Sequence, residues 1–403
     1  MSRGPRVVVT GVGLHTGHGD TTATWTALGE NRSALTCDHA WRLATSDPEA
    51  STASAFPAVP APDPSPVEFL ADRKLLKYMG PCTQMAVLAA GRALRDAGML
   101  GAEAAPAREA MGLFLATGPI AFDIEQVLAS FKNESTDELQ GLYAAWQRRC
   151  HPLLPFKMLL NMPLGLVSIV FDIKGPNFIL YPGAEQGACA LAHALRGLRR
   201  GRCAAALVGG SACGLGLSPI MNLHRTGRLA SSVAAAQPFS AQHDGWAPAD
   251  QAAFLVLETD EQAARRGRSA YASLDGVEVL GGGAIRSPRP ASARGEGEAE
   301  GQSGAVEQSA DISFCTGSLS PADVAAQRAH ASAATLASAD GMLGVAPAAS
   351  FLLATALACL SLRQGSLPAA LAESGRARPV ARARIAFNGV VGVAAAALSG
   401  GPS

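Results

Sequence analysis

The stretch Arg6-Val7-Val8-Val9-Thr10-Gly11 opens the part of the chain that decides the fold. Its β-branched residues predict a buried strand that ends at the glycine, and residues Thr22 to Leu28 predict the helix that follows. A short apolar strand returns further along, for instance at Ala205 to Val208, after a helical stretch from Cys189 to Leu198. This alternation of strands and helices predicts a layered α/β fold.

The composition excludes several classes of protein. The 403 residues are 48% hydrophobic and 16% charged, so most of the chain has enough apolar material to form a large core. The 33 Lys and Arg residues balance the 33 Asp and Glu residues, so we expect neither nucleic acid nor a membrane as a partner. The eight cysteines show no CxxC pair, and the first ten residues show no apolar leader. These features predict reduced thiols and a cytoplasmic protein.

One uncharged segment, residues 341–362, is nominally long enough to span a bilayer. It is rich in Ala and Ser and contains Pro347, which favours a helix buried by protein on every side. The histidines are scattered, so no metal site is expected. His193 lies on a mostly apolar stretch, which favours a histidine satisfied within the core.

Two glycine-rich segments are similar to known motifs but have the wrong spacing. Gly11-Val12-Gly13 follows the first strand, yet the next glycines do not complete a nucleotide-binding fingerprint, so a plain turn is predicted. Gly210-Ser211-Ala212-Cys213-Gly214 misses the nucleophile elbow by one residue. Ser211 is therefore also predicted to lie in a turn.

The composition of the sequence changes near residue 258. Asp260 to Arg268 predicts a charged helix, residues 289–308 are a Gly, Ser, Glu and Ala run with little to bury, and Ala322 to Ala337 predicts an Ala-rich helix. These features predict two unequal halves, 1–258 and 259–403, with a flexible loop at about 289–308.

Several short segments, taken in their order and spacing, carry a resemblance to a known family. They are Pro155-Phe156-Lys157-Met158, Gly175-Pro176, Leu207-Val208-Gly209-Gly210, Pro238-Phe239-Ser240 and Asp244-Gly245-Trp246. Together with the first strand and helix, they resemble the β-ketoacyl synthases of the thiolase-like superfamily. The resemblance implies a thiolase-like five-layered αβαβα sandwich of two related halves.

The residues that the family uses for catalysis are missing at the matching positions. The family's nucleophilic cysteine lies nine residues after Gly175 and twenty-five before Gly209, and both counts reach Ala184. A methyl group cannot take an acyl chain as a thioester. The family's two histidines match Cys315, or Thr316 if one residue is lost, and Gly341, while its lysine matches Leu336. The resemblance therefore implies no catalytic residue.

A ketosynthase-like chain without these groups resembles the chain length factor, or ketosynthase β subunit, of type II polyketide synthases. Such a subunit pairs with an active ketosynthase α subunit as a heterodimer and shapes the acyl tunnel during decarboxylative elongation of a polyketide or polyene. The resemblance implies acyl carrier protein as a further partner. It also implies that no cofactor binds directly, because the phosphopantetheine of the carrier protein acts through the partner subunit.

Further residues have two possible roles each. A glutamine often replaces the cysteine in chain length factors, and here Gln186 follows Glu185, two positions beyond Ala184. Gln186 is either an interface or decarboxylation residue, or a polar residue that caps the start of a helix. The resemblance places Ile120, Ala121, Phe122 and Ile124 where the acyl pocket meets the dimer interface, and ordinary core packing is the alternative for them.

Two other functions remain open from the sequence. One is an enzyme with relocated thiol chemistry, a malonyl decarboxylase or acyltransferase that uses Cys189, Cys213 or Cys315. The other is a homodimeric acyl-binding scaffold without a ketosynthase partner.

Overall fold

The computed structural model describes residues 4–40, 55–118, 151–181, 185–281, 310, 312–316, 335–388 and 392–400. One sheet of ten strands organises these residues, in the order β10-β9-β13-β14-β8-β1-β7-β6-β4-β5. Its strands are β1 (Val7–His15), β4 (Gly112–Thr117), β5 (Asn177–Leu180), β6 (Ala205–Cys213), β7 (Asp250–Thr259), β8 (Ala272–Gly281), β9 (Ile312–Thr316), β10 (Thr335–Ala337), β13 (Arg382–Asn388) and β14 (Gly392–Gly400). Two small hairpins are built from β2 (Thr36–Ala40) with β3 (Ala55–Ala58), and from β11 (Ser366–Leu367) with β12 (Arg378–Pro379).

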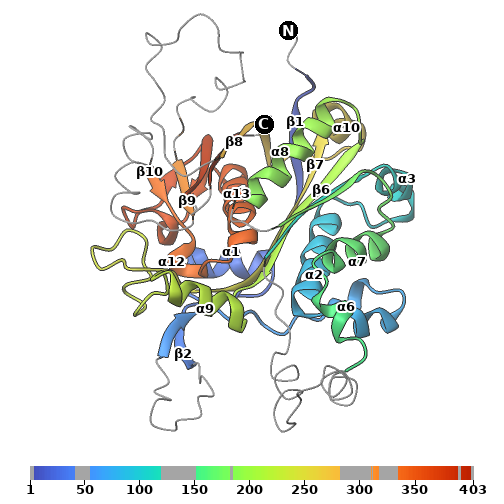
Figure 1. Ribbon diagram of the computed structural model, residues 1–403. Helices are drawn as coiled ribbons and strands as arrows, with labels where there is room; N and C mark the ends of the chain where they lie inside the picture. Colours follow the sequence, from blue (N-terminus) through green and yellow to red (C-terminus); the bar gives the residue numbers. More distant parts are fainter. Residues whose placement is uncertain are drawn as a thin grey trace, which may run out of the picture.

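The helices pack on both faces of this sheet. They are α1 (Thr21–Gly29), α2 (Pro81–Asp96), α3 (Ala105–Glu109), α6 (Leu154–Met158), α7 (Met162–Phe171), α8 (Gln186–Arg199), α9 (Leu217–Arg225), α10 (Asp260–Arg265), α12 (Asp340–Leu343) and α13 (Pro347–Gln364). Figure 1 shows the sheet curling so that its two ends lie on either side of α8 and α13. Helices α2 and α7 cover the opposite face of the end that holds β4 and β6.

The core has two main parts, one on each face of β6. On the inner face, Val208 packs in a cluster with Leu191 of α8 and Phe351 of α13. On the outer face, Leu207 shares a cluster with Met85 of α2. Strand β6 is buried on both faces, which explains its continuous run of small and apolar residues.

The first strand is longer than its sequence predicts. β1 continues through Gly11 and Gly13 to His15, with an irregularity between Val9 and Gly11, so the turn predicted at Gly11-Val12-Gly13 is wrong. A Cβ at Gly13 would lie 2.1 Å from the carbonyl oxygen of Ala89, because α2 packs directly on this strand. The glycines serve close packing of a helix on a strand, not a change of chain direction.

Ser211 also lies in a strand where a turn is predicted. It is fully buried in β6, and its hydroxyl donates a hydrogen bond to the carbonyl oxygen of Cys82 at 2.8 Å. At the preceding position, a Cβ on Gly210 would lie 2.2 Å from the carbonyl oxygen of Ala348. Gly210 therefore marks the point where α13 contacts β6, whereas a Cβ on Gly209 would meet the ring of Phe254.

Other predicted elements agree with the structure, with one correction. The uncharged segment contains α12 and α13, and α13 is buried along nearly its whole length, as the sequence predicts. Among the described residues, no helix combines the length and the apolarity needed to cross a membrane. The helix predicted for Ala322 to Ala337 is wrong at its end, since residues 335–337 form β10 beside β9. The predicted loop at about 289–308 lies outside the described residues.

Candidate functional site

The described positions that the resemblance matches to catalytic residues lie in β9, β10 and α12. Ala184 lies outside the described residues, as do Ile120, Ala121, Phe122 and Ile124. Cys315 and Thr316 end β9, Leu336 lies in the neighbouring strand β10, and Gly341 lies in α12. The structure thus describes three of the four degenerate positions, together with Glu185 and Gln186.

Cys315 and Leu336 are packed against each other in an apolar cluster. Cys315 is 1% exposed, Leu336 is 2% exposed, and the partly buried ring of Phe239 packs on both. The Cys315 thiol donates a long hydrogen bond to the carbonyl oxygen of Ser313 at 3.7 Å. At the positions where the resemblance implies a histidine and a lysine, this chain has a buried thiol packed against an apolar side chain.

A side chain at Gly341 would have to displace Gln237. A Cβ at this position would lie 2.3 Å from Oε1 of Gln237 and 2.9 Å from Cδ of Pro238. The side-chain amide of Gln237 donates a hydrogen bond to the carbonyl oxygen of Gly341 at 2.9 Å. Gln237 therefore occupies the space that an imidazole at position 341 would need.

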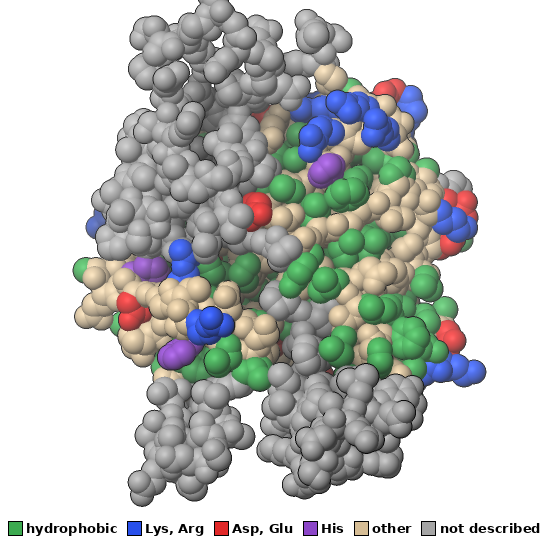
Figure 2. Space-filling view, in the orientation of Figure 1, with side chains coloured by type: hydrophobic (Ala, Val, Ile, Leu, Met, Phe, Trp, Pro, Cys, Tyr) green, Lys and Arg blue, Asp and Glu red, His purple; other side chains and the backbone are tan. Residues whose placement is uncertain are grey.

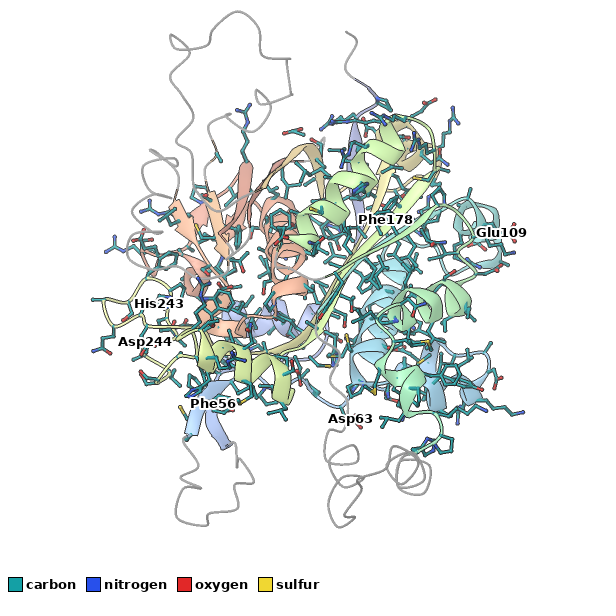
Figure 3. All side chains as sticks on the ribbon, viewed as in Figure 1. Phe56, Asp63, Glu109, Phe178, His243 and Asp244 are labelled. Atoms are coloured by element: carbon teal, nitrogen blue, oxygen red, sulfur yellow. The ribbon has the colours of Figure 1, made fainter. Side chains whose placement is uncertain are left out.

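The loop that carries Gln237 is held by its own hydrogen bonds. The Asp244 carboxylate accepts a hydrogen bond from the backbone N–H of Ser231 at 3.2 Å, and the His243 ring lies 3.0 Å from the carbonyl oxygen of Ala235. Figure 3 shows His243 and Asp244 side by side near α9 and α12. These contacts hold the loop together, and the hydrogen bond from Gln237 to Gly341 joins the loop to α12.

Thr316 forms a buried polar link between β9 and α12. Its hydroxyl donates a hydrogen bond to Oδ1 of Asp340 at 2.9 Å, and the backbone N–H of Asp340 donates to the hydroxyl of Ser338 at 3.2 Å. Thr316 is 2% exposed and Asp340 is 8% exposed. These hydrogen bonds join β9 to α12. They stabilise the fold, because the buried donors and acceptors satisfy one another.

Helix α8 begins at Gln186, with Glu185 as its N-cap residue. The Glu185 side chain makes no capping hydrogen bond, and its Oε1 accepts a hydrogen bond from the side-chain amide of Gln186 at 3.0 Å. Its second oxygen, Oε2, is buried without a hydrogen-bond partner among the described residues. Glu185 and Gln186 thus form a polar pair that follows position 184 in the sequence. A role of Gln186 at an interface or in decarboxylation, as opposed to a polar residue at the helix start, stays a prediction.

The thiols named for relocated chemistry are poorly suited to it. Burial and the nearby Glu185 carboxylate raise the pKa of the half-buried Cys189 thiol, which disfavours the nucleophilic thiolate. Cys213 is 2% exposed at the end of β6, and Cys315 is the buried thiol described above.

A further thiol, Cys82, is missed by the sequence patterns. Its hydrogen bonds, first with Cys213 and then with Ser211 and Thr117, lower the pKa of the Cys82 thiol. Cys82 has no exposed surface, however, so no substrate reaches it in this conformation. Cys82 lies near Cys213 because α2 packs on β6. No local sequence pattern reveals this contact.

His193, which the sequence favours as a core residue, is only half buried. Its ring stacks on Phe178 of β5, with centroids 4.9 Å apart and planes inclined by 25°. Figure 3 shows Phe178 beside α8, well away from His243 and Asp244. In the described parts of the chain, no group of three or more His, Cys, Asp or Glu side chains is arranged to hold a metal ion.

Comparison with known proteins identifies the fold and the family. The sequence model for "Beta-ketoacyl synthase, N-terminal domain" matches residues 5–263. The chain is 28% identical over 302 residues to the mitochondrial 3-oxoacyl-acyl-carrier-protein synthase of Arabidopsis thaliana, covering 68% of this chain and 61% of that protein. It is 26% identical over 268 residues to 3-oxoacyl-acyl-carrier-protein synthase 2 of Staphylococcus aureus, covering 64% of this chain and 60% of that one. The aligned part thus spans about three fifths of the length of these curated relatives.

Solved structures match over almost the whole chain. The ishigamide ketosynthase/chain length factor superposes with a TM-score of 0.76 at 18% identity, covering 98% of this chain and 99% of that one. A type II polyketide synthase acyl-carrier protein in complex with its ketosynthase gives a TM-score of 0.74 at 18% identity, covering 98% and 100%. A β-ketoacyl synthase of Burkholderia phymatum gives 0.73 at 20% identity, covering 98% and 99%. These matches show the thiolase-like ketosynthase fold, and the family model shows that this chain belongs to the β-ketoacyl synthase family.

Proposed function

We propose that this chain is a non-catalytic ketosynthase-like subunit, of the chain length factor kind, that pairs with an active β-ketoacyl synthase. In this role it completes the dimer and bounds the tunnel that holds an acyl chain growing on acyl carrier protein by decarboxylative elongation. One observation carries the proposal. Gln237 and Pro238 fill the space beside Gly341, while Cys315, Leu336 and Phe239 close the neighbouring catalytic positions with apolar contacts.

This packing supports a site that has become structural. A catalytic site needs groups that exchange protons or stabilise charge, held beside a space for the substrate. Here the matching positions carry a thiol buried among apolar side chains, a leucine and a glycine without space. Ala184, by sequence, has no nucleophile.

The structural neighbours support the proposed partners. One is a ketosynthase/chain length factor, and another is a ketosynthase with its acyl-carrier protein. We propose the same two kinds of partner here, with phosphopantetheine supplied by the carrier protein. None of the seven described cysteines is in a disulfide, which fits the cytoplasmic location that we propose. We also propose that the boundary near residue 258 separates two related halves.

Intact-mass measurement tests the catalytic part of this proposal. The isolated chain is incubated with malonyl- and acyl-loaded carrier protein, and its mass is recorded before and after treatment with hydroxylamine, which cleaves thioesters. We expect no acyl adduct on this chain. An adduct at Cys189, Cys213 or Cys315 would instead support relocated thiol chemistry.

A further inference from the structure

Two cysteines lie together beneath the start of α2. Cys82 lies in the first turn of that helix, Cys213 ends β6, and their exposed fractions are 0% and 2%. The Cys82 sulfur lies 3.4 Å from Oγ of Ser211, and the Ser211 hydroxyl donates a hydrogen bond to the carbonyl oxygen of Cys82 at 2.8 Å. Side chains two residues apart in a strand point to the same face, so Cys213 lies on the α2 side of β6 as Ser211 does. Both cysteines accordingly belong to the outer part of the core, and a hydrogen bond joins their side chains.

The surroundings of Cys82 favour its thiolate form. Cys82 is the second residue of α2, where the backbone N–H groups and the dipole of the helix stabilise negative charge. The N-cap residue is Gly80, which has no side chain to compete for these N–H groups. Hydrogen bonds with the side chains of Cys213, Ser211 and Thr117 lower the pKa of the Cys82 thiol despite its burial. A thiolate beside a second thiol is the arrangement found in cysteine pairs that are oxidised reversibly.

We propose that Cys82 and Cys213 form a redox-active pair, which a hydroperoxide oxidises to a disulfide. With hydrogen peroxide, the Cys82 sulfur attacks one oxygen, the O–O bond breaks, and the departing hydroxide takes up the proton released from Cys82 to give water. The Cys213 sulfur then attacks the sulfenic acid at Cys82, the S–O bond breaks, and the hydroxyl leaves as a second water with the proton of Cys213. The two sulfurs lose two electrons, and the peroxide is reduced to two molecules of water. The inference is independent of the proposed function.

Because Cys82 has no exposed surface, the size of the oxidant matters. Hydrogen peroxide is little larger than water, and water molecules reach buried polar groups such as the hydroxyls beside these sulfurs. The first turn of a helix also opens locally more readily than its middle. The disulfide joins the start of α2 to the end of β6, and thiol reductants reverse its formation. The pair therefore makes the contact between α2 and β6 depend on the redox state of its surroundings.

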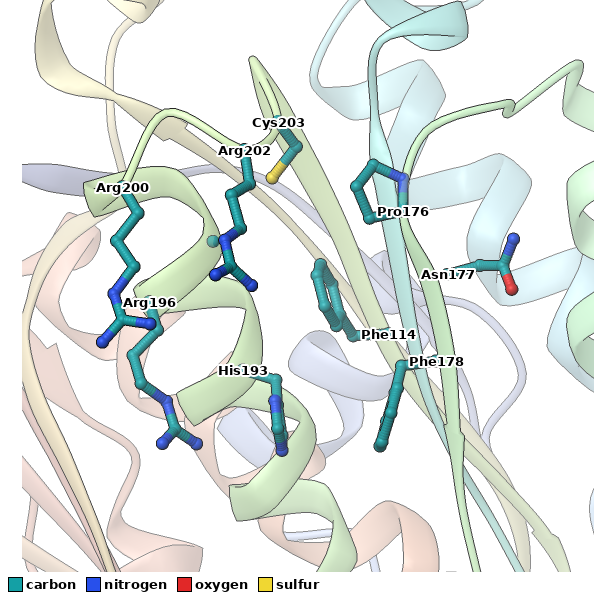
Figure 4. A pocket seen from close by; sticks show the side chains of 10 residues that line it. Phe114, Pro176, Asn177, Phe178, His193, Arg196, Arg200, Arg202 and Cys203 are labelled. Carbon is teal, nitrogen blue, oxygen red and sulfur yellow. The ribbon is translucent and has the colours of Figure 1, made fainter.

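Cys203 provides a demanding comparison within the same chain. It lines a pocket of about 360 Å³ together with Arg196 and Arg202 (Figure 4), and it is 7% exposed. Figure 2 shows Lys and Arg side chains gathered at this end of α8. Cys203 is thus easier to reach than Cys82 and lies nearer to exposed positive charge. Burial nevertheless raises the pKa of the Cys203 thiol, and the described residues that line the pocket include no second thiol. If access alone decided the reaction, Cys203 would be oxidised first.

Peroxide oxidation of the folded, full-length chain tests the inference. Samples taken over a time course at pH 7 are unfolded, alkylated and digested without reductant, and mass spectrometry identifies the oxidised peptides. We expect a pair of peptides joined through Cys82 and Cys213, lighter by about 2 Da than the two reduced peptides together. The pair should form at least about tenfold faster than Cys203 is oxidised, and dithiothreitol should restore both thiols. In Cys213→Ser, oxidation of Cys82 should stop at the sulfenic acid, which dimedone labels. The control Cys359→Ser removes a buried thiol in the inner part of the core and should leave the rate unchanged.

Any of three results would overturn the inference. The first is oxidation of Cys203 ahead of the pair, and the second is oxidation of the exposed Cys37 without any disulfide between Cys82 and Cys213. The third is a disulfide that forms only when urea has unfolded the chain. The wild-type chain decides among these results by itself, so the inference stays testable even if Cys213→Ser does not fold. The measurement needs neither a ketosynthase nor a carrier protein, so its failure would leave the proposed function standing.

Discussion

The side-chain amide of Gln237 donates a hydrogen bond to the carbonyl oxygen of Gly341 at 2.9 Å, and its Oε1 lies where a Cβ on residue 341 would project. The contact joins the loop before β7 to α12, more than one hundred residues away in sequence. It closes the position at which the resemblance places a catalytic histidine. We therefore propose that packing fills the place at which the resemblance implies an imidazole.

Introducing a histidine at this position should destabilise the fold. In Gly341→His, the new side chain displaces Gln237 and meets Pro238, so we expect the free energy of unfolding to fall by about 1–3 kcal/mol. Urea denaturation measures the change. Gly29→His is the control, because a Cβ at Gly29 meets nothing within 4 Å. Adding Gln237→Ala should restore part of the stability of Gly341→His, and equal stability of the two histidine variants would contradict the packing argument.

A buried ion pair at the end of β7 should be far more important than a neighbouring exposed one. Arg266 donates from Nε to Oε1 of the fully buried Glu258 at 3.0 Å, and Thr10 donates to Oε2 at 2.6 Å. Arg266→Ala leaves a buried carboxylate without its cation, so we expect a loss of about 3–5 kcal/mol. Arg265→Ala, which breaks only the exposed pair with Glu261, should change stability by less than about 1 kcal/mol. Similar values for the two variants in urea denaturation would refute this difference.

Alkylation should distinguish the exposed thiol from the thiols of the site. With iodoacetamide at pH 7, we expect Cys37, which is exposed, to react at least about tenfold faster than Cys189, whose pKa is raised by burial. Cys82, Cys213 and Cys315 should react only after unfolding, because they are buried. Peptide mass spectrometry over a time course gives the rates. Faster labelling of Cys189 or Cys315 than of Cys37 would revive the alternative of relocated thiol chemistry.

His15 should make the fold less stable in mild acid. Burial is the main cause that lowers the pKa of His15 to about 4, from 6.5 for an unperturbed histidine. Between these two values the unfolded chain binds a proton that the folded chain does not, so stability falls as the pH decreases from 6.5 towards 4. The expected slope is on the order of 1 kcal/mol per pH unit.

The variant His15→Gln tests that assignment. Glutamine retains a donor for the carbonyl oxygen of Pro62, which lies 3.0 Å from Nε2 of His15. We expect urea denaturation between pH 4 and 6.5 to show a shallower dependence on pH for the variant than for the wild type. An unchanged slope would show that His15 does not titrate on unfolding in this range.

The sequence predicts most of the fold because strands such as β4 and β6 are buried on both faces and the spacing of its motifs is that of a known family. The strand at Ala205, α8 and the buried α13 lie where their apolar patterns indicate. The errors at Gly11, Gly13 and Ser211 have one cause. Each residue serves contact with a distant helix, and local patterns interpret a small or polar residue as a turn.

The site itself is predictable only in part. Counting from glycine anchors indicates that Leu336, Cys315 and Gly341 replace catalytic residues. No count reveals that Phe239 and Gln237 close the space around them, because these two residues reach the site from another loop. The pocket lined by Phe178, His193 and Arg196 cannot be predicted from the sequence either, because it depends on α8 lying beside the edge strand β5.

The most direct test of the account is a native mass spectrum of this chain, tagged and purified from its own host, with peptide identification of any bound protein. We expect a one-to-one complex with a β-ketoacyl synthase that retains its cysteine and both histidines. Recovery of a homodimer alone, with no ketosynthase in either low or high salt, would contradict it.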